Sequence, residues 1–350
     1  MDAQKEQAPD GVRAALQMRD SYDERNRLQD VEAPSLNFQD YIFDTTTEPE
    51  PPDYLLEING VGVMPRGGLT VVSGEKKNGK TSFLTAMVAT MMSGRDFGTM
   101  RRRTAPGKIL WVDTEQSAND MSFAFERLFR QACIPLRDDS KKHDFYILKT
   151  RPLAPVQREQ VLRDAVEQLQ PSVVIVDGIR DLIEDFNDVT QSHYITTEVL
   201  RMLDQHPHMN VVCVIHTNPD STRLRGHLGR ELENKCRDLF NCVKGDAAFT
   251  VTHESRGRQY PGSFVFCIAN TENGATLQVT TIEAAKGVID PEQAFIASVP
   301  EDGATYYTIL SAYRKLTNMS KADADAALKR RIESGDLVKN LKTHLFHRKK

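Results

Sequence analysis

The chain has 350 residues, of which 39% are hydrophobic and 27% are charged. This length and composition allow a sizeable buried core, in one large α/β domain with additions or in two domains. The formal net charge of −4 excludes a chain that is positively charged throughout, so any contact with nucleic acid must come from local patches.

The first 52 residues are polar. Residues 12–28 can form a charged helix, and the run from Thr45 to Pro52 is typical of a linker. Two interpretations stay open for this N-terminal arm. It is either a tail without a partner or an arm that packs on a neighbouring subunit.

Two features predict a cytoplasmic, reduced protein with no membrane partner. The sequence has no apolar signal segment at its start and no apolar run long enough to cross a bilayer. The five cysteines show no C-x-x-C spacing, and Cys213 and Cys267 lie inside apolar runs, which predicts core positions.

From Tyr54 onward, apolar segments alternate between strand and helix patterns, which predicts a parallel sheet with crossover helices. Nearly continuous apolar runs such as Val173–Val176 are typical of strands in the buried middle of such a sheet. Later segments predict antiparallel strands joined by turns that contain Gly and Asn. The predicted strands are 69–72, 108–112, 145–148, 173–176, 211–215, 247–252, 263–268 and 276–280, and the predicted helices are 84–91, 118–131, 156–169 and 194–203.

The stretch after the first of these strands matches the phosphate-binding pattern G-x-x-x-x-G-K-[ST]. Its backbone N–H groups would surround phosphate oxygens at the positive end of the following helix. In this pattern Lys80 contacts the β- and γ-phosphates and the hydroxyl of Thr81 binds Mg²⁺. The predicted cofactors are therefore ATP and Mg²⁺. The predicted binding residues are Gly74, Glu75, Lys76, Lys77, Asn78, Gly79, Lys80, Thr81 and Ser82.

Carboxylates end two of the predicted strands. Asp177 follows an apolar strand, at the place where a second group that holds Mg²⁺ is expected. The next residue is Gly178, so the acid that activates water must come from elsewhere. Asp113 and Glu115 follow another strand, and parallel strands end at one common edge, so Glu115 can orient and deprotonate the attacking water. The alternative is that both are solvated loop acids.

Two further candidates follow later in the chain. His216 comes directly after the strand 211–215, where it either senses the γ-phosphate or is a structural residue. Arg256 and Arg258 lie in a turn between two predicted antiparallel strands. They are either solvated or reach the nucleotide of a neighbouring subunit as an arginine finger, which would require a ring or a filament.

The C-terminal segment, predicted as a separate domain over residues 289–350, is basic. Residues 301–350 contain 11 Lys and Arg against 6 Asp and Glu, an excess of five positive charges. Two predicted helices, 306–316 and 321–333, and a following strand resemble a winged helix-turn-helix. The candidate recognition helix carries Lys329, Arg330 and Arg331, so the domain either contacts DNA or docks a protein.

Together, these motifs resemble the RecA-like ATPases, and within them the hexameric replicative helicases of the DnaB and plasmid RepA type. The resemblance spans residues 58–268 and keeps the family's order of P-loop, glutamate, Mg²⁺-binding aspartate, polar sensor and basic hairpin. The chain looks closer still to the RepA-like ATPases of bacterial mobile elements, especially those of Bacteroidetes, over stretches 67–74, 177–182 and 225–232. It departs from that pattern at Lys76, Lys77 and Thr217.

This resemblance implies a RecA-like P-loop core over residues 53–288, with a central, mostly parallel sheet and antiparallel C-terminal strands. It further implies a homo-oligomeric ring, most simply a hexamer, with ATP bound between subunits. The loops 183–193 and 217–226 would then face a central channel, where Arg223 and Arg225 would contact single-stranded DNA. The alternative for the second loop is a flexible polar segment without a ligand.

The resulting hypothesis is an ATP-driven DNA motor in the replication or mobilisation of a plasmid or mobile element, with other replication or mobilisation proteins as possible partners. Glu115 would be the general base, with Lys80, His216, Arg256 and Arg258 acting on the phosphates. Two alternatives stay open. One is a recombination or repair ATPase that works as a filament, and the other is a regulatory or loader ATPase that binds DNA without unwinding it.

Overall fold

The computed structural model describes residues 37–46, 48, 50–255, 260–271, 274–281, 291–317 and 321–349. The chain divides into two compact units, Met1–Pro51 and Pro52–Lys350. In the first unit a 3-10 helix, η2, spans Phe38–Tyr41 and follows Asn37, whose side-chain oxygen accepts the N–H of Gln39 at 3.1 Å. The helix predicted over residues 12–28 lies outside the described residues.

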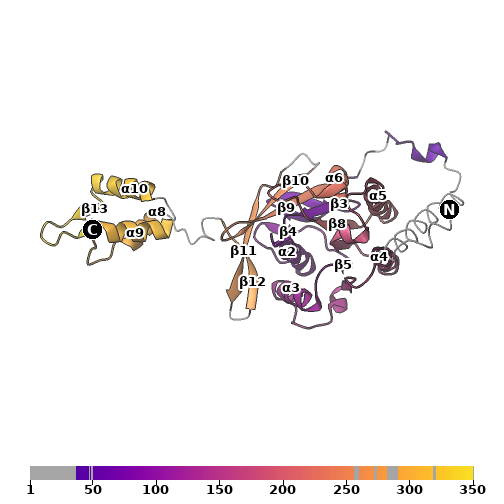
Figure 1. Cartoon of the computed structure of the whole chain (residues 1–350), viewed down its shortest axis with the longest axis horizontal. Coiled ribbons are helices and arrows are strands. Elements are labelled where there is room, and N and C mark those ends of the chain that lie inside the picture. Colours follow the sequence, from indigo (N-terminus) through magenta and orange to yellow (C-terminus); the bar gives the residue numbers. More distant parts are fainter. Residues whose placement is uncertain are drawn as a thin grey trace, which may run out of the picture. The chain divides into compact units, whose positions relative to one another are not determined.

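A nine-stranded sheet forms the centre of the second unit (Figure 1). Its strand order is β12-β11-β10-β9-β3-β8-β7-β5-β6, with parallel pairing from β9 to β6 and antiparallel pairing from β9 to β12. The predicted α/β fold with a mostly parallel central sheet and later antiparallel strands is therefore confirmed. The strands are β3 Leu69–Ser73, β5 Ile109–Asp113, β6 Phe145–Lys149, β7 Val173–Asp177, β8 Asn210–Ile215, β9 Asp238–Lys244, β10 Phe249–Ser255, β11 Phe264–Thr271 and β12 Gly274–Val279.

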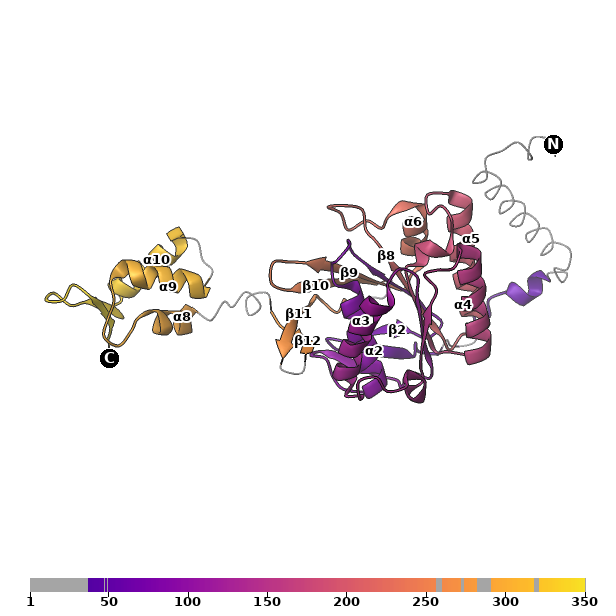
Figure 2. The ribbon, with the colours of Figure 1, turned by 60° about the horizontal axis from the view of Figure 1, so that its bottom comes forward.

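Side chains of the central strands divide between two apolar layers because successive residues of a strand point to opposite faces. Val72 and Ile175 belong to one layer, while Val71 and Val174 belong to the other. Both faces are covered by helices, which explains why these strands are apolar along their whole length (Figure 2). Helices α2 (Lys80–Ser93) and α3 (Ala118–Ala132) supply the first layer, and α4 (Pro155–Leu169), α5 (Val189–Gln205) and α6 (Gly226–Lys235) supply the second.

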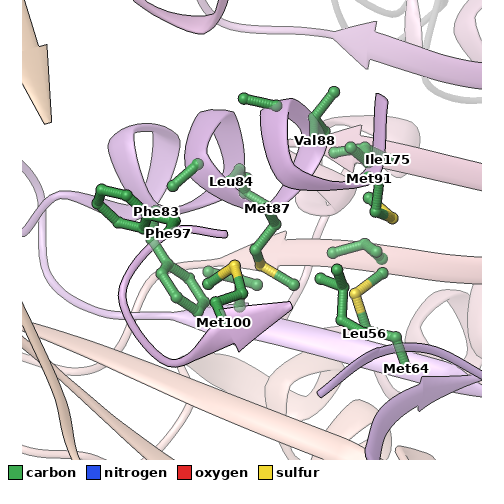
Figure 3. Close-up of a cluster of buried hydrophobic side chains, with 14 of the residues drawn as sticks. Leu56, Met64, Phe83, Leu84, Met87, Val88, Met91, Phe97, Met100 and Ile175 are labelled. Carbon is green, nitrogen blue, oxygen red and sulfur yellow. The ribbon is translucent and has the colours of Figure 1, made fainter. Parts of the chain in front are cut away.

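Helix α2, which follows the phosphate-binding stretch, is buried along almost its entire length (Figure 3). The central sheet contributes Ile175 to the cluster around it, and a second, three-stranded antiparallel sheet contributes Leu56 and Met100. A helix enclosed by two sheets needs apolar residues all round, and α2 has them. The strands of the second sheet are β1 Tyr54–Ile58, β2 Val61–Pro65 and β4 Met100–Arg102.

The structure adds elements that the sequence patterns did not predict and corrects two loop boundaries. The second sheet, strand β9 and helix α6 are the additions. The loop predicted over 183–193 ends at Asp188, because α5 begins at Val189 and the Asp188 side chain accepts the N–H of Gln191 at 2.8 Å. The loop predicted over 217–226 ends one residue earlier, since Gly226 begins α6.

The two cysteines predicted at core positions differ in burial. Cys213 is buried as predicted, whereas Cys267 is only half-buried.

Residues 291–349 contain three helices and a two-stranded hairpin that share their own apolar cluster, which includes Phe295, Ile309 and Leu328. The helices predicted over 306–316 and 321–333 are confirmed to within a residue. The predicted domain boundary at residue 289 lies outside the described residues. Within the described ranges, no helix combines the length and apolar character needed to cross a membrane. The elements are α8 Pro291–Ser298, α9 Tyr306–Thr317, α10 Lys321–Glu333, β13 Leu337–Lys339 and β14 Phe346–Arg348.

A buried polar contact connects the central sheet to the second sheet. Asp238, at the start of β9, accepts the N–H of Met64 in β2 at 2.9 Å. Its other carboxylate oxygen lies 2.8 Å from Nε2 of His253 in β10, and both side chains are only 2% exposed. Each of these groups depends on the others for hydrogen bonding, because water does not reach them.

Replacing Asp238 should therefore destabilise the protein strongly. We expect Asp238→Ala to lower the free energy of unfolding by about 3 kcal/mol or more, since the N–H of Met64 and the ring of His253 lose their partner. Urea titration followed by circular dichroism measures the loss. Asp246→Ala removes the same group at an exposed position and should change stability by less than about 0.5 kcal/mol. Equal effects of the two changes would contradict the role assigned to the buried contact.

Candidate active site

The register of the parallel strands brings the predicted acids to one edge of the sheet. Asp113, the last residue of β5, pairs with Asp177, the last residue of β7. Asp177 pairs in turn with Val214 near the end of β8, so His216 lies just beyond the same edge. Ser73, which ends β3 before the phosphate-binding loop, pairs with Ile215. The edge thus collects the ends of four strands around one pocket, which is lined by Lys76, Lys77, Lys80, Thr81, Glu115, Gln116, Asp177, Gly178, Arg180, Val214, Ile215 and His216.

The loop 74–79 leads into α2 with the geometry of an anion-binding site. Gly79 precedes the helix with a φ of 85°, and no side chain caps the first N–H groups of α2. A Cβ at position 79 would lie 2.6 Å from Cδ1 of Phe249, so only glycine fits between the helix and β10. Helix N–H groups without a side-chain partner suit phosphate oxygens, which the helix dipole also favours.

Lys80 holds its ammonium group over this loop. Its Nζ donates to the carbonyl oxygens of Gly74 at 2.9 Å and Glu75 at 2.8 Å, and lies 3.1 Å from Nδ1 of His216. Burial lowers the pKa of Lys80, while the nearby carboxylates of Asp177 and Glu115 act in the opposite direction. The side chain is therefore already directed into the pocket where a phosphate group would be attracted to it.

Asp177 is a half-buried carboxylate of the pocket. Its Oδ2 lies 3.5 Å from the hydroxyl of Thr81 and accepts a hydrogen bond from Gln116 Nε2 at 3.3 Å. Desolvation and the neighbouring carboxylates of Asp113 and Glu115 together raise the pKa of Asp177 to about 7, against the effect of Lys80. A carboxyl group with so high a pKa is costly to ionise in this environment. A bound divalent cation would stabilise its ionised form.

Asp113 is buried beside it and orders the segment that follows β5. One of its oxygens accepts the N–H groups of Glu115 at 3.1 Å and Gln116 at 2.7 Å, and the other accepts Gln116 Nε2 at 2.7 Å. Burial raises the pKa of Asp113, although these hydrogen bonds act to lower it. Asp113 is therefore not a solvated loop acid. It fixes the backbone from which Glu115 projects.

Glu115 occupies the space beside Gly178. Gly178 has a φ of 106°, and a Cβ there would lie 2.1 Å from Oγ1 of Thr114 and 3.3 Å from Cγ of Glu115. No side chain fits at position 178, so an acid directly after Asp177 is sterically excluded. The Glu115 side chain is 47% exposed, and its Oε1 lies 4.0 Å from Nε2 of His216. It is thus an accessible carboxylate on the open side of the pocket.

His216 lies between the lysine and the glutamate. Burial lowers the pKa of its imidazole, and the charge of Lys80 lowers it further. The ring contacts three groups, because Nδ1 lies 3.1 Å from Nζ of Lys80 and 3.3 Å from the carbonyl oxygen of Gly74, and Nε2 lies 4.0 Å from Oε1 of Glu115. His216 is therefore placed where it would respond to a change at any of these groups.

The residues present fit a Mg²⁺–nucleoside triphosphate. Backbone N–H groups and Lys80 supply the positive charge that phosphates need, while the hydroxyl of Thr81 and the carboxylate of Asp177 are hard oxygen ligands of the kind that Mg²⁺ prefers. Mg²⁺ keeps several waters and is completed by phosphate oxygens, so two protein groups suffice.

The loop 217–225 is attached to the pocket at three points. The N–H of Thr217 donates to the carbonyl oxygen of Gly74 at 3.4 Å and the N–H of Arg225 to that of His216 at 3.0 Å. The N–H of Asp220 donates to Oε1 of Glu75 at 2.7 Å. Arg223 and Arg225, predicted to contact DNA, lie in this loop with exposed side chains. The guanidinium of Arg225 lies 5.4 Å from the ring centre of Phe186, so it is held against the chain on one side.

Other predicted residues lie away from the pocket or outside the described ranges. Arg256 and Arg258 are not among the described residues, whereas the antiparallel strands predicted before and after them are confirmed as β10 and β11. Lys329, Arg330 and Arg331 lie on α10, as predicted.

Two residues of the site were missed by the sequence patterns. Gln116 bridges the carboxylates of Asp113 and Asp177, and its position directly after Glu115 was the one signal available. Arg180 lines the pocket and stacks on Phe186, with 4.5 Å between its guanidinium carbon and the ring centre. Nothing in the sequence alone connects an arginine after Asp177 with an aromatic residue six positions later.

The fold and this pocket define a P-loop ATPase. A family model described as an AAA domain matches residues 32–221, more than half of the chain. The chain therefore belongs to this AAA domain family. No curated protein is significantly similar in sequence.

Two solved structures share the fold at low sequence identity. The flagellar accessory protein FlaH from Methanocaldococcus jannaschii is 12% identical, with 63% of this chain and 93% of that chain covered and a TM-score of 0.44. A KaiC-like protein from the hyperthermophilic archaeon Pyrococcus horikoshii OT3 is 15% identical, with 67% and 100% covered and a TM-score of 0.43. These likenesses concern the fold alone.

The raised pKa of Asp177 predicts a pH-dependent stability. The folded protein keeps this proton up to about pH 7, whereas the unfolded chain loses it near pH 4, so ionisation disfavours folding increasingly as the pH rises between these values. Asp177→Asn should therefore gain stability over the wild type from pH 4 to pH 7, by on the order of 4 kcal/mol, and level off above it.

Urea unfolding in the presence of EDTA across this pH range measures the effect. Asp246→Asn, at an exposed position, should give a curve parallel to that of the wild type. If Asp177→Asn is also parallel, the carboxylate is not desolvated as described.

Proposed function

We propose that the protein is an ATP-driven DNA motor of the RepA-like helicase kind, acting on single-stranded DNA in the replication or mobilisation of a plasmid or mobile element. The observation that carries the chemical part is the position of Glu115. It lies against Gly178 in the same pocket as Lys80, with its carboxylate accessible.

In this proposal, Glu115 orients the attacking water and accepts its proton as the bond to the γ-phosphorus forms. Lys80 stabilises the charge that gathers on the β- and γ-phosphate oxygens. Thr81 and Asp177 hold Mg²⁺, which when bound neutralises part of that charge. His216, in contact with both Lys80 and the edge of Glu115, responds to the loss of the γ-phosphate.

The DNA part rests on the attachment of loop 217–225 to the pocket. His216 is joined to Arg225 through a backbone hydrogen bond, and Glu75 of the phosphate-binding loop holds Asp220. A change at the γ-phosphate would therefore be transmitted to a loop that presents Arg223 to solvent. An arginine in an exposed loop suits sequence-independent contact with the phosphates of a single strand.

The proposal also includes a homo-oligomeric ring, most simply a hexamer. ATP would be bound between subunits, and Arg256 and Arg258 would complete the site of the neighbouring copy as the arginine finger. Support comes from the half-exposed Glu115, which leaves one side of the pocket open to a further group. Mass measurement with a non-hydrolysable ATP analogue tests the ring.

Glu115→Gln should lower the rate of ATP hydrolysis about 100-fold to 10,000-fold, because the amide cannot accept the proton of water. Binding of a fluorescent ATP analogue should stay near the wild-type value, since the side chain is not among the phosphate ligands. Glu167→Gln, at a carboxylate that is 61% exposed on α4, serves as the matched control. A Glu115→Gln variant with normal turnover would overturn the assignment of the general base.

Arg223→Ala should weaken binding of a fluorescent single-stranded oligonucleotide and reduce the slope of log K against log salt by about 0.7, the value for one phosphate contact. Arg95→Ala, which removes an exposed arginine after α2, should change neither quantity.

The motor itself is tested by ATP hydrolysis with and without single-stranded DNA and by unwinding of a forked duplex. We expect stimulation and unwinding. Hydrolysis that is indifferent to DNA would exclude a motor, and strand exchange by filaments without unwinding would indicate a recombination ATPase instead.

A further inference from the structure

We propose that the C-terminal domain grips duplex DNA with the β13–β14 hairpin, and not with helix α10. In this arrangement Lys339 and Lys342 contact phosphates and Leu341 enters the minor groove at the turn. This inference adds a duplex site to the proposed motor, and it rests on that function only for its biological setting. The binding itself is independent of ATP hydrolysis.

The first argument is that the charges of α10 are largely engaged within the domain. Lys329 Nζ lies 2.8 Å from Asp325 Oδ2 on the same helix. Arg331 pairs with Glu292 and, at 3.4 Å, with Asp336, and its guanidinium carbon lies 4.8 Å from the ring centre of Phe295. Releasing these partners to bind DNA would cost part of the energy gained. The helix as a whole carries four Lys and Arg against three Asp and Glu.

The second argument is the charge of the hairpin. Residues 337–350 contain five Lys and Arg, two His and no Asp or Glu. Lys339 and Lys342 are exposed, and among the described residues no carboxylate forms an ion pair with either of them or with Arg348. The Nζ of Lys339 lies 5.9 Å from the ring centre of Phe346, a contact that leaves the residue exposed. Cations without a carboxylate partner gain the most from a polyanion, because each phosphate contact releases condensed counterions.

The third argument is that hydrogen bonds hold the hairpin in a defined conformation. Asn340 closes its turn: the side-chain oxygen accepts the N–H of Lys342 at 2.9 Å and of Thr343 at 3.3 Å. The start of β14, just after the turn, is fixed by a reciprocal backbone pair between Ala304 and Phe346, with distances of 3.1 and 2.9 Å. Little ordering entropy is therefore lost when the hairpin binds.

Leu341 is the most exposed large apolar side chain of this domain, at 85% exposure, and the closed turn holds it there. It lies at the tip, with Lys339 and Lys342 close by in sequence on either side. Proteins that bind the minor groove commonly insert one apolar side chain between base steps while cations hold the flanking phosphates. The minor groove is about 6 Å wide and admits a turn, but not a helix such as α10.

A duplex fits better than an anionic membrane, the other polyanionic surface. Interfacial anchoring requires a broad apolar face, and this hairpin offers one large side chain at its tip. Vesicles containing phosphatidylserine therefore form a separate arm of the test.

The experiment measures binding of a fluorescent 20-base-pair duplex by the full chain without nucleotide, over a range of salt concentrations. Lys339→Ala with Lys342→Ala should weaken binding about 30-fold at 0.15 M salt and reduce the salt slope by about 2, the effect of two lost phosphate contacts. Lys329→Ala with Arg330→Ala removes the same charge from α10 and should weaken binding much less. Thermal unfolding of both variants checks that the domain stays folded.

Leu341→Ala tests the wedge separately. A duplex with 2-aminopurine at a central step should brighten on binding the wild type, because the base is unstacked, and this increase should be lost in the variant while the salt slope stays unchanged. An increase that persists would overturn the role of Leu341.

Three outcomes overturn the proposal: equal weakening by the two double variants, a larger effect of the α10 variant, or retention by vesicles in place of duplex. If the wild type binds duplex through the hairpin but does not unwind forks, the proposed motor function is wrong and the proposed hairpin site is supported. If it unwinds forks and the two double variants bind duplex equally, the proposed hairpin site is wrong and the motor function is supported.

Discussion

Carboxylates crowded at one end of the sheet are the constraint on which the active site depends. Asp113 and Asp177 are neighbours across β5 and β7, and Glu115 follows two residues later. Negative charges this close repel one another, and the hydrogen bonds of Gln116 and the ammonium of Lys80 offset only part of that repulsion, since the pKa of Asp177 stays raised. A divalent cation at Asp177 would offset more of it, so the way the sheet ends favours binding of a cation together with phosphates.

Two acids at this edge of the sheet, Asp177 and Glu115, lie in different surroundings and suit different roles. Asp177 is half-buried and faces Thr81, which suits a metal ligand, whereas the Glu115 side chain is 47% exposed, which suits exchange of protons with water. Gly178 keeps the two acids apart, because its backbone conformation and the closeness of Thr114 leave no room for a side chain there. The exposed acid of the pocket therefore comes from the segment that follows β5.

Sequence patterns predicted the parallel core well because its strands are buried on both faces. A continuous apolar run such as Val173–Val176 is hard to interpret as anything but a buried strand. The phosphate-binding pattern shows where the loop after β3 begins and ends. The second sheet was missed although Asn59 and Gly60, both with positive φ, form a two-residue turn of the kind that joins β1 and β2. Strand β9 was missed because it pairs with β3 far away in the chain, and such pairing has no local signature.

Side-chain partnerships were the other part that the sequence could not provide. The acids were placed correctly at the sheet edge because strand ends are predictable, but the bridging role of Gln116 depends on a register that only three dimensions fix. Net charge likewise says nothing about which cations have partners. On α10, which the sequence indicated as the candidate recognition helix, Lys329 and Arg331 lie beside neighbouring carboxylates.

The enclosure of helix α2 has a consequence for how nucleotide enters and leaves. Since α2 is packed between two sheets, the N–H groups at its start are held in place by the fold itself. Binding of a ligand there therefore costs little further conformational entropy. The side-chain contact that joins the phosphate-binding loop to the segment 217–225 is different, because the hydrogen bond from the N–H of Asp220 to Oε1 of Glu75 is exposed to solvent. The start of α2 would therefore stay unchanged as a nucleotide binds or leaves, and any rearrangement would fall on this exposed contact.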